Sequence, residues 1–235
     1  MMQNPKAFSP FALQHGLLAD MQQDEFPTRL LAWSHQALEL TRGATHFGFV
    51  FSGEAVLNCT SGSFTLKPGM YFSVSGSATV SGSSEGIIVS RLGYDGFFQL
   101  GGPVEESGRL NYIDGCTDSL LIAPIMIGDP CLNLLCFPPG IDQTSHTHPS
   151  MRVGIVVSGE GICHTREDSI PLRPGQVFII HAHQEHAFAT QGQAMRVIAY
   201  HPDSDFGATH QDHPMINRTI VDGVSAAELP HLQTR

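Results

Sequence analysis

The stretch FGFVFSGE at residues 47–54 decides the fold, because it returns 106 residues later as VGIVVSGE at residues 153–160. The same offset carries LKPG at residues 66–69 onto LRPG at residues 172–175. One offset that holds through two separated motifs without a gap indicates a tandem duplication of a single structural unit.

Each copy of this unit has the pattern of short strands joined by turns. A glycine, three apolar residues and Ser-Gly-Glu are typical of a short buried strand that ends in a turn. After each Pro-Gly turn an aromatic-bearing strand follows, at residues 70–74 and 176–180. Short strands separated by frequent turns fit a closed barrel or a sandwich, so the sequence predicts an all-β fold.

The duplication also sets the expected domain organisation. We expect an N-terminal barrel in residues 1–110 and a C-terminal barrel, with a polar tail, in residues 111–235. Helix is expected only at residues 10–21 and 225–229, where Ser225 is a candidate N-cap. Residues 122–127, in the segment that joins the two copies, are expected to add an edge strand.

Composition excludes several classes of function. The chain has 235 residues and a net charge of −10, and its 12 Lys and Arg residues form no cluster, which argues against nucleic acid as a partner. Its five cysteines show no CxxC spacing, as expected for reduced thiols in a cytoplasmic protein. No apolar run is long enough for a signal peptide or a membrane span, so no membrane association is expected.

Three histidines form the pattern richest in chemistry. His146 and His148 are two residues apart, and side chains at this spacing on a strand point to the same face. His186 follows a Pro-Gly turn and can return to that face on an antiparallel neighbour. Three imidazoles that converge inside a small barrel would make a transition-metal site.

These residues resemble the two signatures of the cupin superfamily. Gly140, the His-x-His at 146–148 and Gly159 are in register with the first signature, and Gly175 and His186 fit the spacing of the second. The resemblance covers residues 130–200 and extends more weakly to residues 30–95. It implies a bicupin, with two small antiparallel jelly-roll (double-stranded β-helix) barrels.

The resemblance also implies which barrel carries the metal. His146, His148 and His186 would hold one divalent transition metal, Fe, Zn, Ni or Mn. The same offset places the corresponding N-terminal positions at Leu40, Arg42 and Val80, none of which binds a metal as imidazole does. That half is therefore expected to be structural or a lid.

Arg152 is a departure from the family pattern, because it stands where cupins carry a Glu that is often the fourth ligand. A three-histidine face without this carboxylate occurs among cupin-type metalloenzymes, including thiol and diketone dioxygenases. By register the Arg152 side chain enters the barrel, and a buried guanidinium needs an anion or hydrogen-bonding groups. It either holds the carboxylate of a small anionic ligand or pairs internally with Glu160 or Asp142.

Other polar residues near these motifs leave alternatives open. His183, in the same turn as His181, is a candidate general acid or base or a partner to the ligands, with a solvated turn as the alternative. Only one of Cys163 and His164 can face inward, and Cys163 would bring a thiol near the metal. The histidines and aspartate within residues 210–213 form either a ligand cluster or solvated surface.

The sequence therefore favours a mononuclear metalloenzyme of the dioxygenase type that acts on a small anionic organic substrate, with Arg152 and His183 as candidate catalytic residues. Alternatives are a small-molecule-binding or sensing cupin, a non-redox isomerase or lyase at the same site, and an assembly protein whose metal is structural. We expect a homodimer, with a monomer as the alternative.

Overall fold

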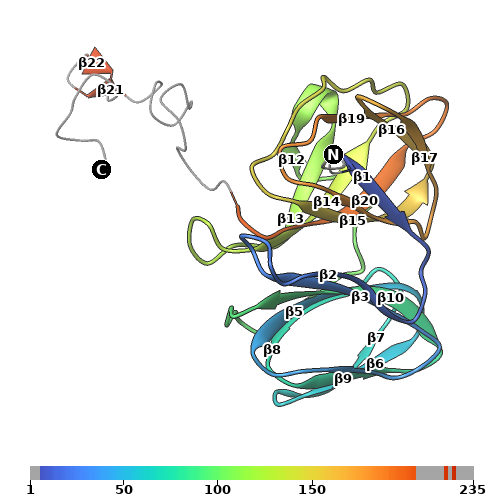
Figure 1. Ribbon diagram of the computed structural model, residues 1–235, viewed down its shortest axis with the longest axis vertical. Coiled ribbons are helices and arrows are strands. Elements are labelled where there is room, and N and C mark those ends of the chain that lie inside the picture. The colour runs from blue at the N-terminus through green and yellow to red at the C-terminus, as the bar shows by residue number, and fades with distance from the viewer. Residues whose placement is uncertain (1–5, 205–219, 222–223, 226–235) are drawn as a thin grey trace, which may run out of the picture.

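The computed structural model describes residues 6–204, 220–221 and 224–225, and this part of the chain is almost entirely β-structure. The one helical segment described is a single 3-10 turn, η1, at Ile113–Gly115. The strands form antiparallel sheets that pair into two jelly-roll sandwiches, one above the other in Figure 1. The predicted all-β fold of two tandem barrels is confirmed.

The C-terminal barrel is built from a large and a small sheet. The large sheet has the order β1-β18-β15-β20-β14-β13-β12, and the small one the order β17-β16-β19. The strands are β1 (Phe8–Phe11), β12 (Leu110–Asn111), β13 (Thr117–Ile122), β14 (Cys131–Phe137), β15 (Arg152–Gly159), β16 (Gly161–Thr165), β17 (Ser169–Leu172), β18 (Val177–Ile180), β19 (His186–Ala189) and β20 (Met195–His201).

The N-terminal barrel repeats this plan. Its large sheet has the order β11-β8-β5-β10-β3-β2, and its small sheet the order β4-β9-β6-β7. The strands are β2 (Gly16–Met21), β3 (Thr28–Ser34), β4 (Leu38–Leu40), β5 (Ala44–Gly53), β6 (Ala55–Cys59), β7 (Gly62–Leu66), β8 (Tyr71–Ser75), β9 (Ala78–Ser81), β10 (Ser84–Leu92) and β11 (Gln99–Gly101). A separate short hairpin pairs β21 (Ile220–Val221) with β22 (Val224–Ser225).

The repeated sequence motif is the central strand of each large sheet. In β5 and β15 the apolar residues are buried almost without a break. Continuous burial occurs because one face of each strand lies over the barrel's own core and the other lies against the second barrel. This explains why the duplicated stretch shows an apolar run where a half-exposed strand would alternate.

Three apolar clusters account for the core. One fills the C-terminal barrel and includes Phe137, Phe178 and Phe188, and a second fills the N-terminal barrel around Trp33 and Phe72. The third lies between the two large sheets, and residues of both halves contribute to it. The barrels therefore pack back to back through their large sheets, as Figure 1 shows for β2, β3 and β10 below β14, β15 and β20.

One strand departs from the expected grouping of residues 1–110. β1 pairs with β18, so residues 8–11 extend the large sheet of the C-terminal barrel. In Figure 1 the blue strand β1 lies among the green and orange strands of that barrel. β1 covers the edge of β18 as β11 covers the edge of β8 in the other barrel.

The helix expected at residues 10–21 is wrong, because this segment holds the end of β1 and the whole of β2. Gly16 has a φ of 109°, which no helix accommodates, and both strands pair with sheet edges that would otherwise be open. The edge strand expected at residues 122–127 is also wrong, because β13 ends at Ile122 and the residues after it form bends and a turn. The helix expected at 225–229 lies, beyond Ser225, outside the described residues.

The first barrel ends and the second begins between β11 and β12. Residues 102–109 cross from one large sheet to the other, and Arg196 of β20 donates to the Glu105 carbonyl over 2.9 Å. At the other end of the barrel, Ser204 donates to the Asp129 carbonyl over 2.7 Å and ties the segment after β20 to the start of β14. Among the described residues no helix has the length and apolarity needed to cross a bilayer.

Candidate metal centre

Three imidazoles meet inside the C-terminal barrel. His146 and His148 belong to the segment between β14 and β15, and His186 begins β19. An isolated antiparallel bridge pairs the backbones of His146 and His186 through two 3.0 Å hydrogen bonds. The three ring centroids lie 4.5–5.1 Å apart, and one ring nitrogen of each lies within 4.8 Å of those of the other two. The sequence prediction that these three side chains converge is confirmed.

Backbone carbonyls determine which nitrogen each ring presents. The Nδ1 of His146 lies 2.9 Å from the Thr144 carbonyl, and the Nδ1 of His186 lies 3.1 Å from the Gln184 carbonyl. A carbonyl oxygen only accepts, so Nδ1 carries the proton in both rings and Nε2 keeps a free lone pair. This orientation of ligand histidines by a backbone acceptor is common in metal sites.

Burial keeps the His148 and His186 rings neutral. Burial, with a smaller contribution from the Arg152 charge, lowers the pKa of His148 to about 3. Burial also lowers the pKa of His186 to about 4, against the Gln184 carbonyl, which raises it. Because a metal binds the unprotonated imidazole, both rings are in the ligating form at neutral pH.

The donor set fits one divalent transition metal. Three imidazole nitrogens and no carboxylate suit Fe, Zn, Ni or Cu better than Mg or Ca, which prefer oxygen. In the described part of the chain this is the single group of three or more His, Cys, Asp or Glu side chains that converges in this way. Three protein ligands leave at least one coordination position for a further ligand, which is the hallmark of a catalytic metal.

The equivalent positions of the N-terminal barrel are apolar. β4 pairs Leu38 with Val80 of β9, as His146 pairs with His186. The structural counterparts of His146 and His148 are therefore Leu38 and Leu40, two residues earlier than a constant offset predicts. All three residues are buried in the N-terminal core, whereas Arg42, which the offset had indicated, is exposed.

A small cavity of about 20 Å³ adjoins the three histidines. By volume it holds one or two groups of the size of water. Its other walls are mostly aliphatic and aromatic, with a few polar side chains among them. Those walls are Tyr112, Leu135, Phe137, Gln143, Arg152, Val153, Phe178, Ile180, Phe188, Val197, Ala199 and His201.

His201 is a site residue that sequence reasoning missed. It ends β20, its ring centroid lies 6.5 Å from that of His148, and burial lowers its pKa well below the usual value. No motif spacing indicates it. The signal was the alternation of β20, because Val197, Ala199 and His201 share one face and all three line the cavity.

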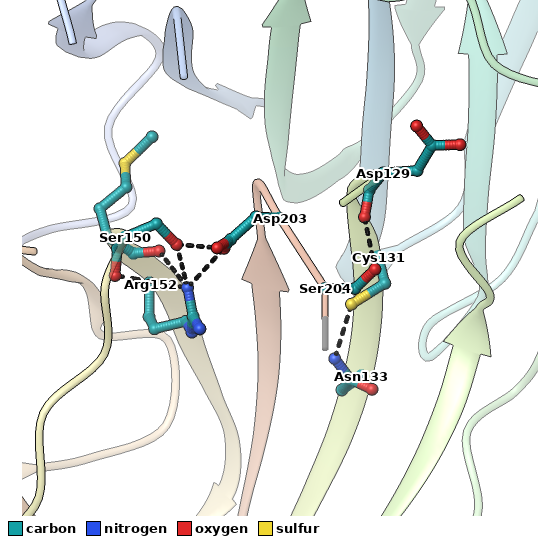
Figure 2. A network of polar contacts seen from close by, with 8 residues as sticks. Asp129, Cys131, Asn133, Ser150, Arg152, Asp203 and Ser204 are labelled. Atoms are coloured by element: carbon teal, nitrogen blue, oxygen red, sulfur yellow. Dashed lines mark hydrogen bonds and ion pairs between the residues drawn. The ribbon is translucent and has the colours of Figure 1, made fainter. Parts of the chain in front are cut away.

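Arg152 does enter the barrel, and its internal partner is Asp203. The Arg152 Nη1 lies 3.1 Å from Oδ1 of Asp203, and both side chains are largely buried. Figure 2 shows Ser150, Arg152 and Asp203 joined in one network. The partners expected from the sequence, Glu160 and Asp142, are both exposed and make no contact with Arg152. The sequence did not indicate Asp203, because this residue lies two positions after β20 and not on β15 or in the turn that follows it.

The remaining sequence candidates lie away from the cavity. His183 is exposed in a turn with φ of 61°, and its backbone N–H donates to the His148 carbonyl over 2.8 Å. His181 contacts Ser9 of β1. Of Cys163 and His164, it is Cys163 that faces inward. Its side chain packs in the apolar core and does not line the cavity. The cluster at residues 210–213 lies outside the described residues.

Comparisons with known proteins agree with the fold and the motif. Residues 133–207 match the family model described as Cupin domain. No curated protein matches the chain. The match and the solved structures described next support a place in the cupin superfamily.

Three solved structures illustrate the similarity of fold. A cupin 2 conserved barrel domain protein from Leptotrichia buccalis is 11% identical, with a TM-score of 0.58, over 85% of this chain and 91% of that one. Protein Ylba from E. coli is 18% identical, with a TM-score of 0.59, over 88% of both chains. The salicylate 1,2-dioxygenase of Pseudaminobacter salicylatoxidans is 10% identical, with a TM-score of 0.59, over 75% of this chain and 70% of that one. At these identities the likeness concerns the fold alone.

Proposed function

We propose that this protein is a bicupin metalloenzyme with one mononuclear site, in the barrel formed mainly by residues 111–235. His146, His148 and His186 are the proposed ligands of a divalent metal, and the N-terminal barrel has a structural role. The observation that carries the proposal is the convergence of three imidazoles, two with the tautomer set by backbone carbonyls, beside a cavity. Open coordination positions favour a catalytic over a structural metal.

The cavity limits the reacting part of the substrate. A space of about 20 Å³ accommodates one or two water-sized groups, far less than a typical pocket for a whole organic ligand. We propose that a small polar end of the substrate enters the cavity. The rest of the substrate would lie outside the cavity.

A dioxygenase-type reaction on a small anionic organic substrate is the chemistry we favour. A bound metal would polarise substrate oxygens as a Lewis acid and, if it is iron, would also supply redox chemistry with O₂. The aromatic and aliphatic walls, among them Phe137, Phe178 and Phe188, exclude bulk water and strengthen electrostatic contacts in the cavity. Arg152 is the cationic group within reach of an anionic substrate.

We assign proton handling to His201 in preference to His183. The His201 ring lines the cavity, whereas the His183 side chain lies in an exposed turn. A group that moves a proton needs hydrogen-bonding reach to the substrate, directly or through one water. His183 would meet this condition only with a substrate that extends out of the cavity.

The comparisons lend limited support to this choice. One solved structure with the same fold is a salicylate 1,2-dioxygenase in complex with gentisate. At 10% identity that likeness extends to the fold and not to the reaction. A whole aromatic ring also exceeds the cavity described above.

A non-catalytic binding or sensing protein is the second candidate, favoured by the small size of the cavity. A non-redox isomerase or lyase would use the same residues. The five cysteines are all free, which supports the proposed cytoplasmic location. We also propose a homodimer, because cupin barrels associate through sheet edges.

The test is metal analysis of protein purified without chelator, followed by oxygen uptake with a panel of small carboxylates and thiols. We expect one metal ion per chain and uptake that depends on substrate, and the His146→Ala variant should lose both. An iron-loaded protein with no uptake on any compound would overturn the oxygenase proposal. A metal-free protein that takes up no added iron, zinc, nickel or manganese would overturn the metal site itself.

A further inference from the structure

The Arg152 guanidinium is bonded on one side only. Its Nη1 takes part in all four of its hydrogen bonds, donating to the Ser150 carbonyl over 3.3 Å, to the Met151 carbonyl over 3.0 Å, to Asp203 over 3.1 Å and to the Ser150 hydroxyl. Ser150 in turn donates to Asp203. Figure 2 shows these bonds gathered on one nitrogen of the group.

The opposite edge of the group has no partner among the described residues. Arg152 is only 9% exposed, and its Nε is buried without a hydrogen bond to any described residue. The described residues provide no bond to Nη2 either. Leaving a donor of a charged group buried and unsatisfied costs free energy, so a partner is expected there.

The Arg152 side chain forms part of the wall of the cavity at the metal centre. Arg152 lines the same cavity as His146, His148 and His186. The Nε and Nη2 N–H groups of an arginine point in parallel and match the two oxygens of a carboxylate. The described residues that line the cavity include no Asp or Glu, and Asp203, the one described acidic residue bonded to the guanidinium, is engaged on Nη1.

We propose that the Nε–Nη2 edge of Arg152 is the receptor for one planar oxyanion, the carboxylate of the substrate. This inference deepens the proposed function and rests on it for the term substrate, although the anion site itself is defined without a metal. The small cavity favours a monocarboxylate end of formate size over a tetrahedral sulfate or phosphate. Asp203, on the other side of the guanidinium, disfavours a second carboxylate by repulsion.

The test is calorimetric titration of the full-length protein, zinc-loaded and metal-free, with formate, nitrate, acetate and sulfate. We expect saturable binding of formate and nitrate in both forms, tighter in the zinc-loaded form, and no binding of sulfate. Arg152→Lys keeps the charge but loses the planar fork, and we expect about tenfold weaker binding. Arg173→Lys is the matched control, because Arg173 is exposed and does not line the cavity, and its affinities should equal those of the wild type.

Removing the guanidinium with Arg152→Met alone would leave the buried Asp203 carboxylate unpaired, and the protein could fail to fold. The double variant Arg152→Met with Asp203→Asn avoids this, because it removes both charges. We expect it to bind zinc as the wild type does and to lose formate and nitrate. Equal formate affinity in the wild type and in Arg152→Lys or the double variant would overturn the anion receptor, and so would binding that does not saturate. If the wild-type protein binds formate but does not bind zinc, only the proposed metal function is overturned.

Discussion

Backbone carbonyls orient the imidazoles of the candidate metal centre. The Thr144 and Gln184 carbonyls lie two residues before His146 and His186, so the same short motif sets both tautomers. At the residue scale the three ligands were predictable, because the spacing of histidines on a strand fixes which face they share. Asp203 and His201 were not, since their proximity depends on how β20 lies beside β15 and β14.

Replacing one ligand should weaken metal binding strongly without unfolding the barrel. For His148→Ala we expect metal affinity to fall roughly 100-fold or more, because loss of a ligand exceeds the 10–100-fold typical of losing its hydrogen-bonded support. Competition titration with a chromophoric chelator measures it. His164→Ala, whose ring bonds to Ser169 outside the cavity, is the control, and an equal loss in both variants would contradict the assignment.

A histidine far from the metal centre should make stability depend on pH. His46 is buried in the N-terminal barrel, and burial lowers its pKa although the Thr41 and Gly76 carbonyls raise it. The unfolded chain, with an unperturbed pKa near 6.5, therefore binds this proton more readily than the folded one. By linkage, the free energy of unfolding should fall as pH drops below about 6.5.

Urea denaturation at pH 7.5, 6.5 and 5.5, with chelator present to remove metal effects, measures this dependence. In His46→Gln the contribution is absent, so the loss of stability between pH 7.5 and 5.5 should be smaller than in the wild type. Identical pH slopes in the two proteins would refute the role given to His46.

At the scale of the element, both copies of the duplicated motif contain a contact between a glycine and an aromatic ring. Gly48 of β5 pairs with Phe72 of β8, and Gly154 of β15 pairs with Phe178 of β18. A Cβ at either glycine would lie 2.1 Å or 2.2 Å from the ring of its partner. The ring occupies the place of the missing side chain, which explains why both copies keep the glycine and the aromatic residue at one offset.

Alanine at either glycine should therefore overpack the barrel. We expect Gly48→Ala and Gly154→Ala each to lower the free energy of unfolding by about 1–3 kcal/mol. Gly192→Ala is the matched control, because nothing lies within 4 Å of its added Cβ, and it should change stability by less than about 0.5 kcal/mol. Denaturant midpoints that are alike in all three variants would contradict this explanation.

The N-terminal strand supports the wall of the cavity in the other barrel. Phe8 of β1 is buried and stacks on Phe178 at 5.1 Å between ring centroids, and Phe178 lines the cavity. We expect Phe8→Ala to cost about 3 kcal/mol of stability and to weaken metal binding. Phe97→Ala, at a residue 65% exposed, should do neither. Unfolding curves and metal titrations that match the wild type for Phe8→Ala would count against this support.

At the scale of the whole molecule, the repeat predicted two similar β-barrels because each copy carries the same strand and turn motifs at one offset. It did not predict that β1 crosses to the C-terminal barrel, since strand pairing between distant segments leaves no local pattern. The helix expected at residues 10–21 was wrong for the same reason: open sheet edges, absent from the sequence, determine the conformation of that segment.

Because the two large sheets pack back to back, each barrel has its own core, and the two cores differ in the residues at the position of the candidate metal centre. Each barrel core is separate, and one is filled by Leu38, Leu40 and Val80 where the other places three histidines. From this difference we expect a single metal ion per chain.

Anomalous diffraction from crystals grown with the metal that co-purifies tests the central claim most directly. We expect one anomalous peak per chain, about 2.0–2.2 Å from a nitrogen of each of His146, His148 and His186. A metal peak bound by other side chains, or a second peak in the N-terminal barrel, would contradict the assignment of the metal centre. So would a metal ion at full occupancy elsewhere in the protein while no ion lies between the three imidazoles.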